Sequence, residues 1–390
     1  MRQQRLLATG STSTAEIAPW KTLLEAFGRQ ARKGEVCITK SSTAAGERSR
    51  KPNAHPLTKS SLRESVFVTE QSLLRVKLAH RSKSFWYPHP TLRNIPALER
   101  LSTEAGLDLL QSCRGQYGKV ADIGAADGDL AFFLEKVGLS VDVIDNEATN
   151  FNRLEGARIL KEALQSSVSI RSVDLDSQFL LHGEKYDAVF LLGILYHLKN
   201  PFFVLETLAR MTRYCFVGTR IARQTPDGRP LSPYPVAYLL SPRECNDDNT
   251  NFWIFSEEGL KRLIDRTGWK LLSYLAVGDT TSSNPADSDR DERAFCLLQS
   301  KNMPTLSASP NPVPAGKGSG STTVSWDSGD NGEAKVYVST DGSEESLFAA
   351  ERQGSAAAPW IQAGCSYEFR LYSSDHTKLL DKITVTRTVE

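Results

Sequence analysis

The sequence predicts an α/β domain with a mostly parallel sheet, followed by a small all-β sandwich. Strand-like and helix-like patterns alternate between residues 118 and 300, which is typical of a sheet covered by helices on both faces. A glycine-containing turn joins the first strand of this region to its first helix. A Pro/Ser-rich segment then precedes short alternating runs, which predict the sandwich.

The elements of the α/β region follow from their apolar periodicity. The predicted strands are Lys119–Ile123, Ser140–Ile144, Val168–Val173, Tyr186–Leu192, Tyr214–Thr219, Trp269–Val277 and Arg293–Gln299. The predicted helices are Asp129–Lys136, Asn152–Gln165, Pro201–Met211 and Ser256–Thr267, the last with Ser256 as its N-cap. Residues 278–292 carry no helix pattern, so the last two strands should form an antiparallel hairpin at the sheet edge.

Helix patterns also precede this region. A stripe of Leu73, Leu74, Lys77 and Leu78 predicts one helix. The segment Phe85–Asn94 holds two prolines and three aromatic residues, and we expect a rigid loop there. Residues 96–110 resume a helical pattern.

Four parts are therefore expected along the 390 residues. Residues 1–61 should be a basic, largely disordered arm, with one amphipathic piece at Trp20–Phe27. Residues 62–300 form the α/β domain with its N-terminal helical extension. Residues 301–316 are a linker, and residues 317–390 an immunoglobulin-like or fibronectin-like sandwich.

Composition narrows the function classes. The net charge is +1, but residues 1–100 hold 18 Lys/Arg against 7 Asp/Glu. The N-terminal 100 residues are therefore basic and the remaining 290 residues are acidic. Six scattered cysteines without a C-x-x-C pair argue against zinc or a disulfide framework, so we expect no metal. No apolar run approaches 18 residues, and no secretory signal follows the first residues. A cytoplasmic location is expected.

The segment Val120–Asp129 (VADIGAADGD) is the strongest candidate for a ligand site. Gly124, Ala125 and Gly128 form a turn between a strand and a helix, where backbone can approach a ligand. Asp122 and Asp127 or Asp129 could take an ammonium group, whereas three acids would repel a phosphate. A glycine turn alone is weak support, and these acids could instead only cap turns.

Two further acids end the next two predicted strands. Asp145, followed by Asn146, stands where an acid can accept both hydroxyls of a ribose. Asp174, followed by Leu175, is placed to receive an adenine amino group. Ligands of open α/β sheets bind at the carboxyl ends of strands, so the three acids predict one nucleoside site.

This pattern resembles the class I S-adenosylmethionine (SAM)-dependent methyltransferases over about residues 98–299. The resemblance implies a Rossmann-like seven-stranded sheet with an antiparallel last strand, SAM as cofactor, and Leu192 at the methyl-donor pocket. The usual middle glycine of the turn is Ala126 here. Tyr196 and His197 follow the fourth strand, where family members line this pocket. His197 could act as a general base or could be structural.

A closer similarity is to methyltransferases related to the wobble-uridine tRNA carboxymethyltransferases. It rests on Phe85–Pro88 (FWYP), Leu192–Pro201 (LGILYHLKNP) and Asn246–Ser256 (NDDNTNFWIFS). Those enzymes continue the aromatic-proline loop with a lysine that contacts a carboxylated SAM, which His89–Arg93 lacks. Their two arginines after the Tyr-His pair are Leu198 and Lys199 here. These differences favour ordinary SAM and weaken the case for a tRNA substrate.

The long segment Ile221–Trp253 is the candidate acceptor lid, because long loops often carry function. We expect acceptor contacts from both this segment and the aromatic loop. The predicted residues are Trp86, Tyr87, Arg93, Arg223, Tyr238, Asn246, Asn251 and Trp253.

Three hypotheses remain open. The first is methylation of a small molecule, glycan or lipid-linked acceptor; the second is tRNA modification, which the basic front fits. The third is a non-catalytic binding protein. An oxidoreductase ranks lower because the turn lacks G-x-G-x-x-G.

Overall fold

The computed structural model describes residues 59–88, 90–177, 179 and 184–389. The predicted disordered arm, including Trp20–Phe27, lies outside these residues apart from its last three positions. Those three positions begin helix α2 (Lys59–Ala79), so the helical extension starts slightly earlier than expected. His89 also lies outside the described residues.

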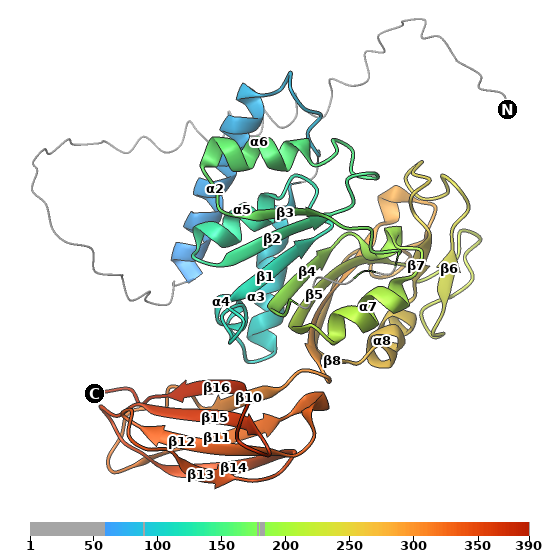
Figure 1. The fold of residues 1–390 in the computed structure, drawn as a ribbon. Helices are drawn as coiled ribbons and strands as arrows, with labels where there is room; N and C mark the ends of the chain where they lie inside the picture. The colour runs from blue at the N-terminus through green and yellow to red at the C-terminus, as the bar shows by residue number, and fades with distance from the viewer. Residues whose placement is uncertain (1–58, 89, 178, 180–183, 390) are drawn as a thin grey trace, which may run out of the picture. The chain divides into compact units, whose positions relative to one another are not determined.

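One mixed sheet forms the α/β domain (Figure 1). Seven longer strands lie in the spatial order β3 (Ser169–Ser172), β2 (Ser140–Asp145), β1 (Lys119–Ile123), β4 (Tyr186–Leu192), β5 (Thr212–Ile221), β9 (Glu292–Ser300) and β8 (Trp269–Gly278). The first five are parallel to one another, and β9 is antiparallel to both β5 and β8. The predicted Rossmann-like sheet and its closing hairpin are confirmed.

Two short strands join this sheet from the predicted lid. β6 (Ala237–Leu239) pairs antiparallel with β7 (Trp253–Phe255), and β7 meets the end of β5 through Ile221 and Phe255. The insertion is therefore partly strand rather than all loop. It has a small apolar cluster of its own, in which Cys245 and Ile254 are buried.

Apolar side chains cover both faces of the sheet because successive residues of a strand point to opposite sides. In β4, Phe190 packs into one cluster, while its neighbours Val189 and Leu191 pack into the other. The first cluster includes α2, α3 (Ile95–Glu104), α5 (Asp129–Lys136) and α6 (Glu155–Leu164). The second includes α7 (Pro201–Ala209) and α8 (Glu257–Arg266), and Ser256 caps α8 as predicted.

Several predicted boundaries were wrong for local reasons. The aromatic loop is shorter than expected, because Thr91–Asn94 forms a 3-10 helix, η3. The helix expected over 96–110 is broken into α3 and α4 (Leu109–Ser112), since Gly106 has φ +71° and Asp108 caps a new helix. Arg153 and Leu154 also have positive φ, so α6 begins only after them.

The C-terminal region is a sandwich of two antiparallel sheets. One contains β10 (Thr305–Ser309), β11 (Gly320–Asp327) and β14 (Gln353–Ile361). The other contains β13 (Ser346–Ala349), β12 (Ala334–Thr340), β15 (Tyr367–Ser373) and β16 (Leu379–Val385). Val324 and Phe369 are buried in its core. The immunoglobulin-like or fibronectin-like label stays a prediction.

The expectation that residues 301–316 form a linker was wrong, because this stretch contains strand β10. Leu306 of this strand is 1% exposed and belongs to the sandwich core, which the surrounding proline and serine residues concealed. Within the described part of the chain, none of the helices is long and apolar enough to cross a membrane. The cytoplasmic location stays a prediction.

Candidate cofactor and acceptor site

The turn between β1 and α5 depends on its glycines. Gly124 and Gly128 have φ +71° and +82°, conformations that favour glycine. A Cβ atom on Gly124 would lie 2.8 Å from the Cβ of Ile194, so no larger residue fits without movement. Ala126 also has a positive φ, +55°, at the position where glycine was expected from the resemblance. The neighbouring Ala125 is buried.

Asp122, near the end of β1, is a buried acid with one oxygen that lacks a hydrogen-bond partner. It is 4% exposed, and its Oδ2 has no hydrogen-bond partner among the described residues. Burial and, to a smaller extent, the nearby charge of Asp145 together raise the pKa of Asp122 to about 7. A backbone hydrogen bond from Ala131 stabilises the carboxylate, but a buried oxygen without a partner is costly, so Oδ2 is suited to a cationic ligand.

Asp145 ends β2 and closes against the turn. Its Oδ2 accepts hydrogen bonds from Ala126 N at 2.9 Å and Asn150 Nδ2 at 3.1 Å. Its Oδ1 accepts from Asn146 N at 2.8 Å, which leaves about one of four acceptor positions open. No cation pairs with it among the described residues, and burial raises its pKa. It is partly exposed, so a ligand hydroxyl could reach it.

Asp127 differs from these two acids because its charge is already balanced. The ammonium of Lys77, on α2, lies 3.0 Å from Asp127 Oδ2 and 2.8 Å from Asp129 Oδ1. Asp127 also accepts from Tyr87 N and from Asn152 Nδ2. Asp127 is 2% exposed. Lys77 thus already supplies an ammonium to both Asp127 and Asp129, and their expected role in taking a ligand ammonium stays a prediction.

The remaining predicted cofactor residues stand at neighbouring strand ends. Asp174 follows β3, is exposed, and accepts from Asp176 N in a local turn. Leu175 is buried behind it. Asn146 uses its own side-chain oxygen to accept from Ala148 N. Leu192 is partly buried at the end of β4. The structure brings the turn, Asp122 and Asp145 together, whereas Asp174 is exposed after β3 and makes no hydrogen bond with them in the described part of the chain.

Tyr196 and His197 lie on a short 3-10 helix, η4 (Leu195–His197), after β4. The Nδ1 atom of His197 is 2.9 Å from Thr250 Oγ1 and 3.2 Å from the Thr250 carbonyl oxygen. A carbonyl can only accept, so Nδ1 carries the proton and Nε2 keeps a lone pair. Burial lowers the pKa of His197, which keeps it neutral near pH 7. A neutral imidazole with a free Nε2 can accept a proton.

The predicted acceptor residues of the insertion have mixed environments. Tyr238 donates to Glu244 Oε1 at 2.6 Å, and Trp253 Nε1 donates weakly to the Lys199 carbonyl. Asn246 is exposed. Asn251 is buried, and its Oδ1 has no partner among the described residues. These four residues lie on the segment that contacts Tyr196 and His197.

Arg223 does not offer a free guanidinium. It is held by Glu292 at 2.6 Å and by Glu257 at 3.4 Å. Both acidic partners balance its charge, and its role in acceptor binding stays a prediction.

The three acceptor residues predicted from the aromatic loop lie instead beside the glycine turn and α2. Trp86 is 6% exposed, and Lys77 lies 5.5 Å from its ring centre. Tyr87 stacks on Phe151 with ring centroids 4.8 Å apart, and its hydroxyl accepts from Phe151 N. Arg93 is exposed and acts electrostatically on Glu70 of α2. Their contacts join them to the turn rather than to the acceptor segment.

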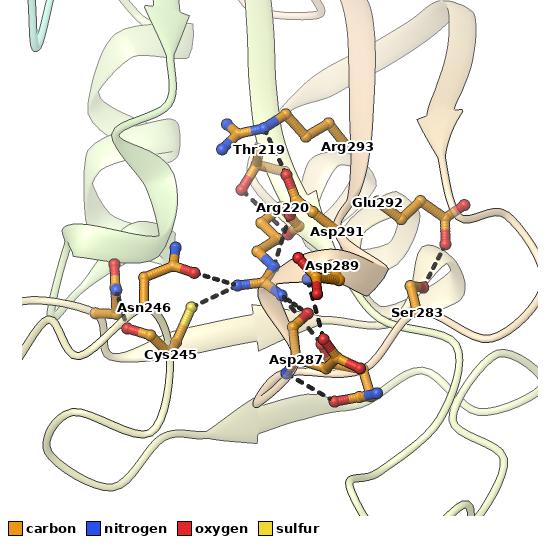
Figure 2. Close-up of polar contacts among 12 residues, drawn as sticks. Thr219, Arg220, Cys245, Asn246, Ser283, Asp287, Asp289, Asp291, Glu292 and Arg293 are labelled. Carbon is orange, nitrogen blue, oxygen red and sulfur yellow. Dashed lines mark hydrogen bonds and ion pairs between the residues drawn. The ribbon is translucent and has the colours of Figure 1, made fainter. Parts of the chain in front are cut away.

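Sequence patterns missed several residues that organise the site. Lys77 stood in the middle of a leucine stripe, where a buried lysine could have been suspected. Arg220, near the end of β5, is 1% exposed, and Figure 2 shows its guanidinium among contacts from distant segments. No spacing pattern pointed to it. Among the described residues, no three His, Cys, Asp or Glu side chains are grouped to hold a metal ion, and the five described cysteines are unpaired.

The strand order and the glycine turn after β1 define a Rossmann-like α/β fold. No family model and no curated protein matches the chain. Among solved structures, it is similar to the N-terminal domain of EvdMO1 in the presence of SAH and D-fucose. The two are 15% identical with a TM-score of 0.37, over 59% of this chain and 96% of that one.

Two other solved structures are comparably distant. TehB from Haemophilus influenzae is 18% identical with a TM-score of 0.34, over 47% of this chain and 57% of that chain. The mitomycin 7-O-methyltransferase MmcR is 12% identical with a TM-score of 0.33, over 61% and 67% of the two chains.

Proposed function

We propose that this protein is a SAM-dependent methyltransferase that acts on a small-molecule, glycan or lipid-linked acceptor. One observation carries the proposal. A buried carboxylate oxygen of Asp122 has no hydrogen-bond partner among the described residues, and it lies beside the Asp145 carboxylate at the ends of adjacent strands. Two neighbouring acids without a cation suit a sulfonium nucleoside better than a pyrophosphate.

The residues present fit such a cofactor in a specific way. Asp145 would accept from ribose hydroxyls, and Asp122 would stabilise the cationic end. Gly124 lets the turn pack directly against Ile194, which a Cβ atom would prevent. Leu175 and Leu192 offer apolar surface at the neighbouring strand ends. When bound, the cofactor supplies an activated methyl group on sulfur.

The protein's own contribution to transfer would come from positioning and from one base. The neutral His197, with Nδ1 held by Thr250, would accept a proton through Nε2 from an acceptor hydroxyl or amine. Tyr196 stands next to it, with the two rings 4.4 Å apart, and would shape the pocket.

Binding and turnover are tested separately. Isothermal titration with SAM, SAH and NAD should give binding for the first two only; no binding of SAM at millimolar concentration overturns the proposal. Incubation with methyl-labelled SAM and fractionated acceptor extracts should then label a fraction with wild type but not with Asp145→Ala. Binding without labelling in any fraction would favour a non-catalytic protein.

A tRNA is the second candidate acceptor, and one surface feature supports it. Phe85 and Phe151 are 72% and 61% exposed beside Tyr87, and Arg81, Lys83 and Arg153 flank them. Exposed aromatic rings among cations suit unstacked bases. Salt-dependent binding of total tRNA that Phe151→Ala weakens would favour this candidate and the relationship to wobble-uridine enzymes.

A further inference from the structure

Arg220 is a buried cation whose contacts lie outside the nucleoside site. Its two terminal nitrogens donate to Cys245 Sγ at 2.7 Å, Asn246 Oδ1 at 3.5 Å, the Asn284 carbonyl at 3.1 Å and the Asp287 carbonyl at 2.9 Å. Its Nε lies 2.7 Å from Asp291 Oδ1 (Figure 2). One guanidinium therefore joins two segments, 245–252 and 284–291, to the end of β5.

The first of these segments leads to His197. Asn251 Nδ2 donates to the Cys245 carbonyl at 3.0 Å, which fixes the turn that Arg220 holds at Cys245. The preceding residue, Thr250, holds His197 Nδ1. The following residue, Phe252, donates its N–H to the Tyr196 carbonyl at 2.8 Å. A shift of the 245–252 segment would therefore move the partners of both Tyr196 and His197.

The second segment leads to Tyr196 from another direction. The Asp291 carboxylate lies between two arginines, 2.7 Å from Arg220 Nε and 3.0 Å from Arg293 Nε. Arg220 and Arg293 are paired across β5 and β9. Arg293 in turn interacts with the Tyr196 side chain. Arg220 thus supports Tyr196 through Asp291 and Arg293, without touching it.

We infer that Arg220 is a positioning residue that sets the geometry of the Tyr196–His197 pair by holding the 245–252 and 284–291 segments together. The inference deepens the proposed methyltransferase function, on which its catalytic meaning rests. Lysine cannot reproduce this role, because its ammonium has three donors on one atom rather than a planar fork.

The titration of His197 reports this geometry without any acceptor. The groups around its ring are Thr250, Asp248, Arg293 and Tyr196. Proton NMR should give a His197 midpoint below 6.5 in the full chain, with the signal assigned by its loss in His197→Gln. In Arg220→Lys the charge is kept but the bonds to two segments are lost. The midpoint should then rise toward 6.5, and the Phe252 amide should exchange faster.

The matched control is Arg171→Lys, since Arg171 is another ion-paired arginine, partly buried between Asp142 and Glu184 and remote in sequence from both segments. It should change neither the His197 midpoint nor Phe252 exchange. SAM affinity, measured on the same samples, should stay within about twofold of wild type in both variants. Absence of SAM binding in wild type would overturn the proposed function but not the role of Arg220.

The role of Arg220 is overturned if Arg220→Lys leaves both the His197 titration and Phe252 exchange unchanged. If that variant does not fold, Cys245→Ala removes one of the contacts while keeping the guanidinium. It should shift the midpoint in the same direction by a smaller amount. An unchanged midpoint in a folded Cys245→Ala protein, with unchanged Phe252 exchange, would overturn the inference equally.

Discussion

The ammonium of Lys77 lies 3.0 Å from the Asp127 carboxylate, although the two residues come from α2 and from the glycine turn. The side chains are 12% and 2% exposed. Burial alone lowers the pKa of Lys77, but Asp129 and Asp127 raise it above its ordinary value. The lysine therefore stays charged at neutral pH, and its stabilising contribution is lost as the pH rises from the ordinary lysine pKa of 10.5 through the raised value.

Replacing Lys77 with methionine should destabilise the protein by about 3 kcal/mol, because two buried carboxylates lose their cation. Urea denaturation at pH 7.5 measures this as a lower midpoint. Arg100→Met is the control, since the Arg100–Glu104 pair is largely exposed and should matter little. Equal losses in the two variants would show that the Lys77 pair contributes no more than a surface pair.

The affinity for SAM should increase as the pH rises through about 7. A cationic ligand favours the ionised form of Asp122, whose pKa lies at about 7, so binding at lower pH must first remove a proton. Titration calorimetry at pH 6, 7 and 8 measures the trend. Asp122→Asn should bind SAM more weakly at pH 8 and lose this part of the pH dependence. A pH profile that is identical in the two proteins would contradict the role of Asp122.

The same acid should limit stability at alkaline pH. Its folded-state pKa of about 7 exceeds the ordinary value of 3.8, so the folded protein holds the proton longer, and stability falls as the pH rises from 4 to 7. Relative to wild type, Asp122→Asn should gain about 2–3 kcal/mol of stability between pH 5 and pH 8.5. Urea denaturation at both pH values tests this, and a constant difference between the proteins would be the contrary result.

Ala126 should tolerate glycine, and Ala125 should not. The positive φ of Ala126 costs about 1–2 kcal/mol relative to glycine, partly offset by the greater freedom of glycine in the unfolded chain. We expect Ala126→Gly to be about 0.5 kcal/mol more stable than wild type, and Ala125→Gly about 1 kcal/mol less stable. Thermal denaturation of the pair gives the comparison. The opposite order would mean that Ala126 is not strained.

The sequence predicted the sheet well because its information is local. Apolar runs such as Tyr186–Leu192 mark buried strands, and Ser256 followed by Glu257 and Glu258 marks a helix start. The first β-strand of the sandwich was not predicted, because Leu306 is its one fully buried residue and prolines and serines surround it. The two strands of the insertion are three residues long, too short for a periodicity to appear.

The candidate site was predictable only in part. Asp122, Asp145 and the glycines follow strand ends, so their positions could be inferred from the element order. The basic residues that pair with the acids of the site could not be inferred in this way. Lys77 reaches the turn from 50 residues away in the chain, and Arg220 gathers segments up to 71 residues further along, at Asp291. Such contacts depend on tertiary packing, which no spacing in a single sequence reports.

The most direct test of the account is the affinity of Asp145→Ala for SAM, measured by titration calorimetry at pH 8. Glu147→Ala is the control, because Glu147 lies two residues away and pairs with Arg158 at the surface. We predict that Asp145→Ala weakens binding at least tenfold, about 1.4 kcal/mol, while Glu147→Ala leaves it within twofold of wild type. SAM affinity that is unchanged in a folded Asp145→Ala protein would contradict the assignment of this site.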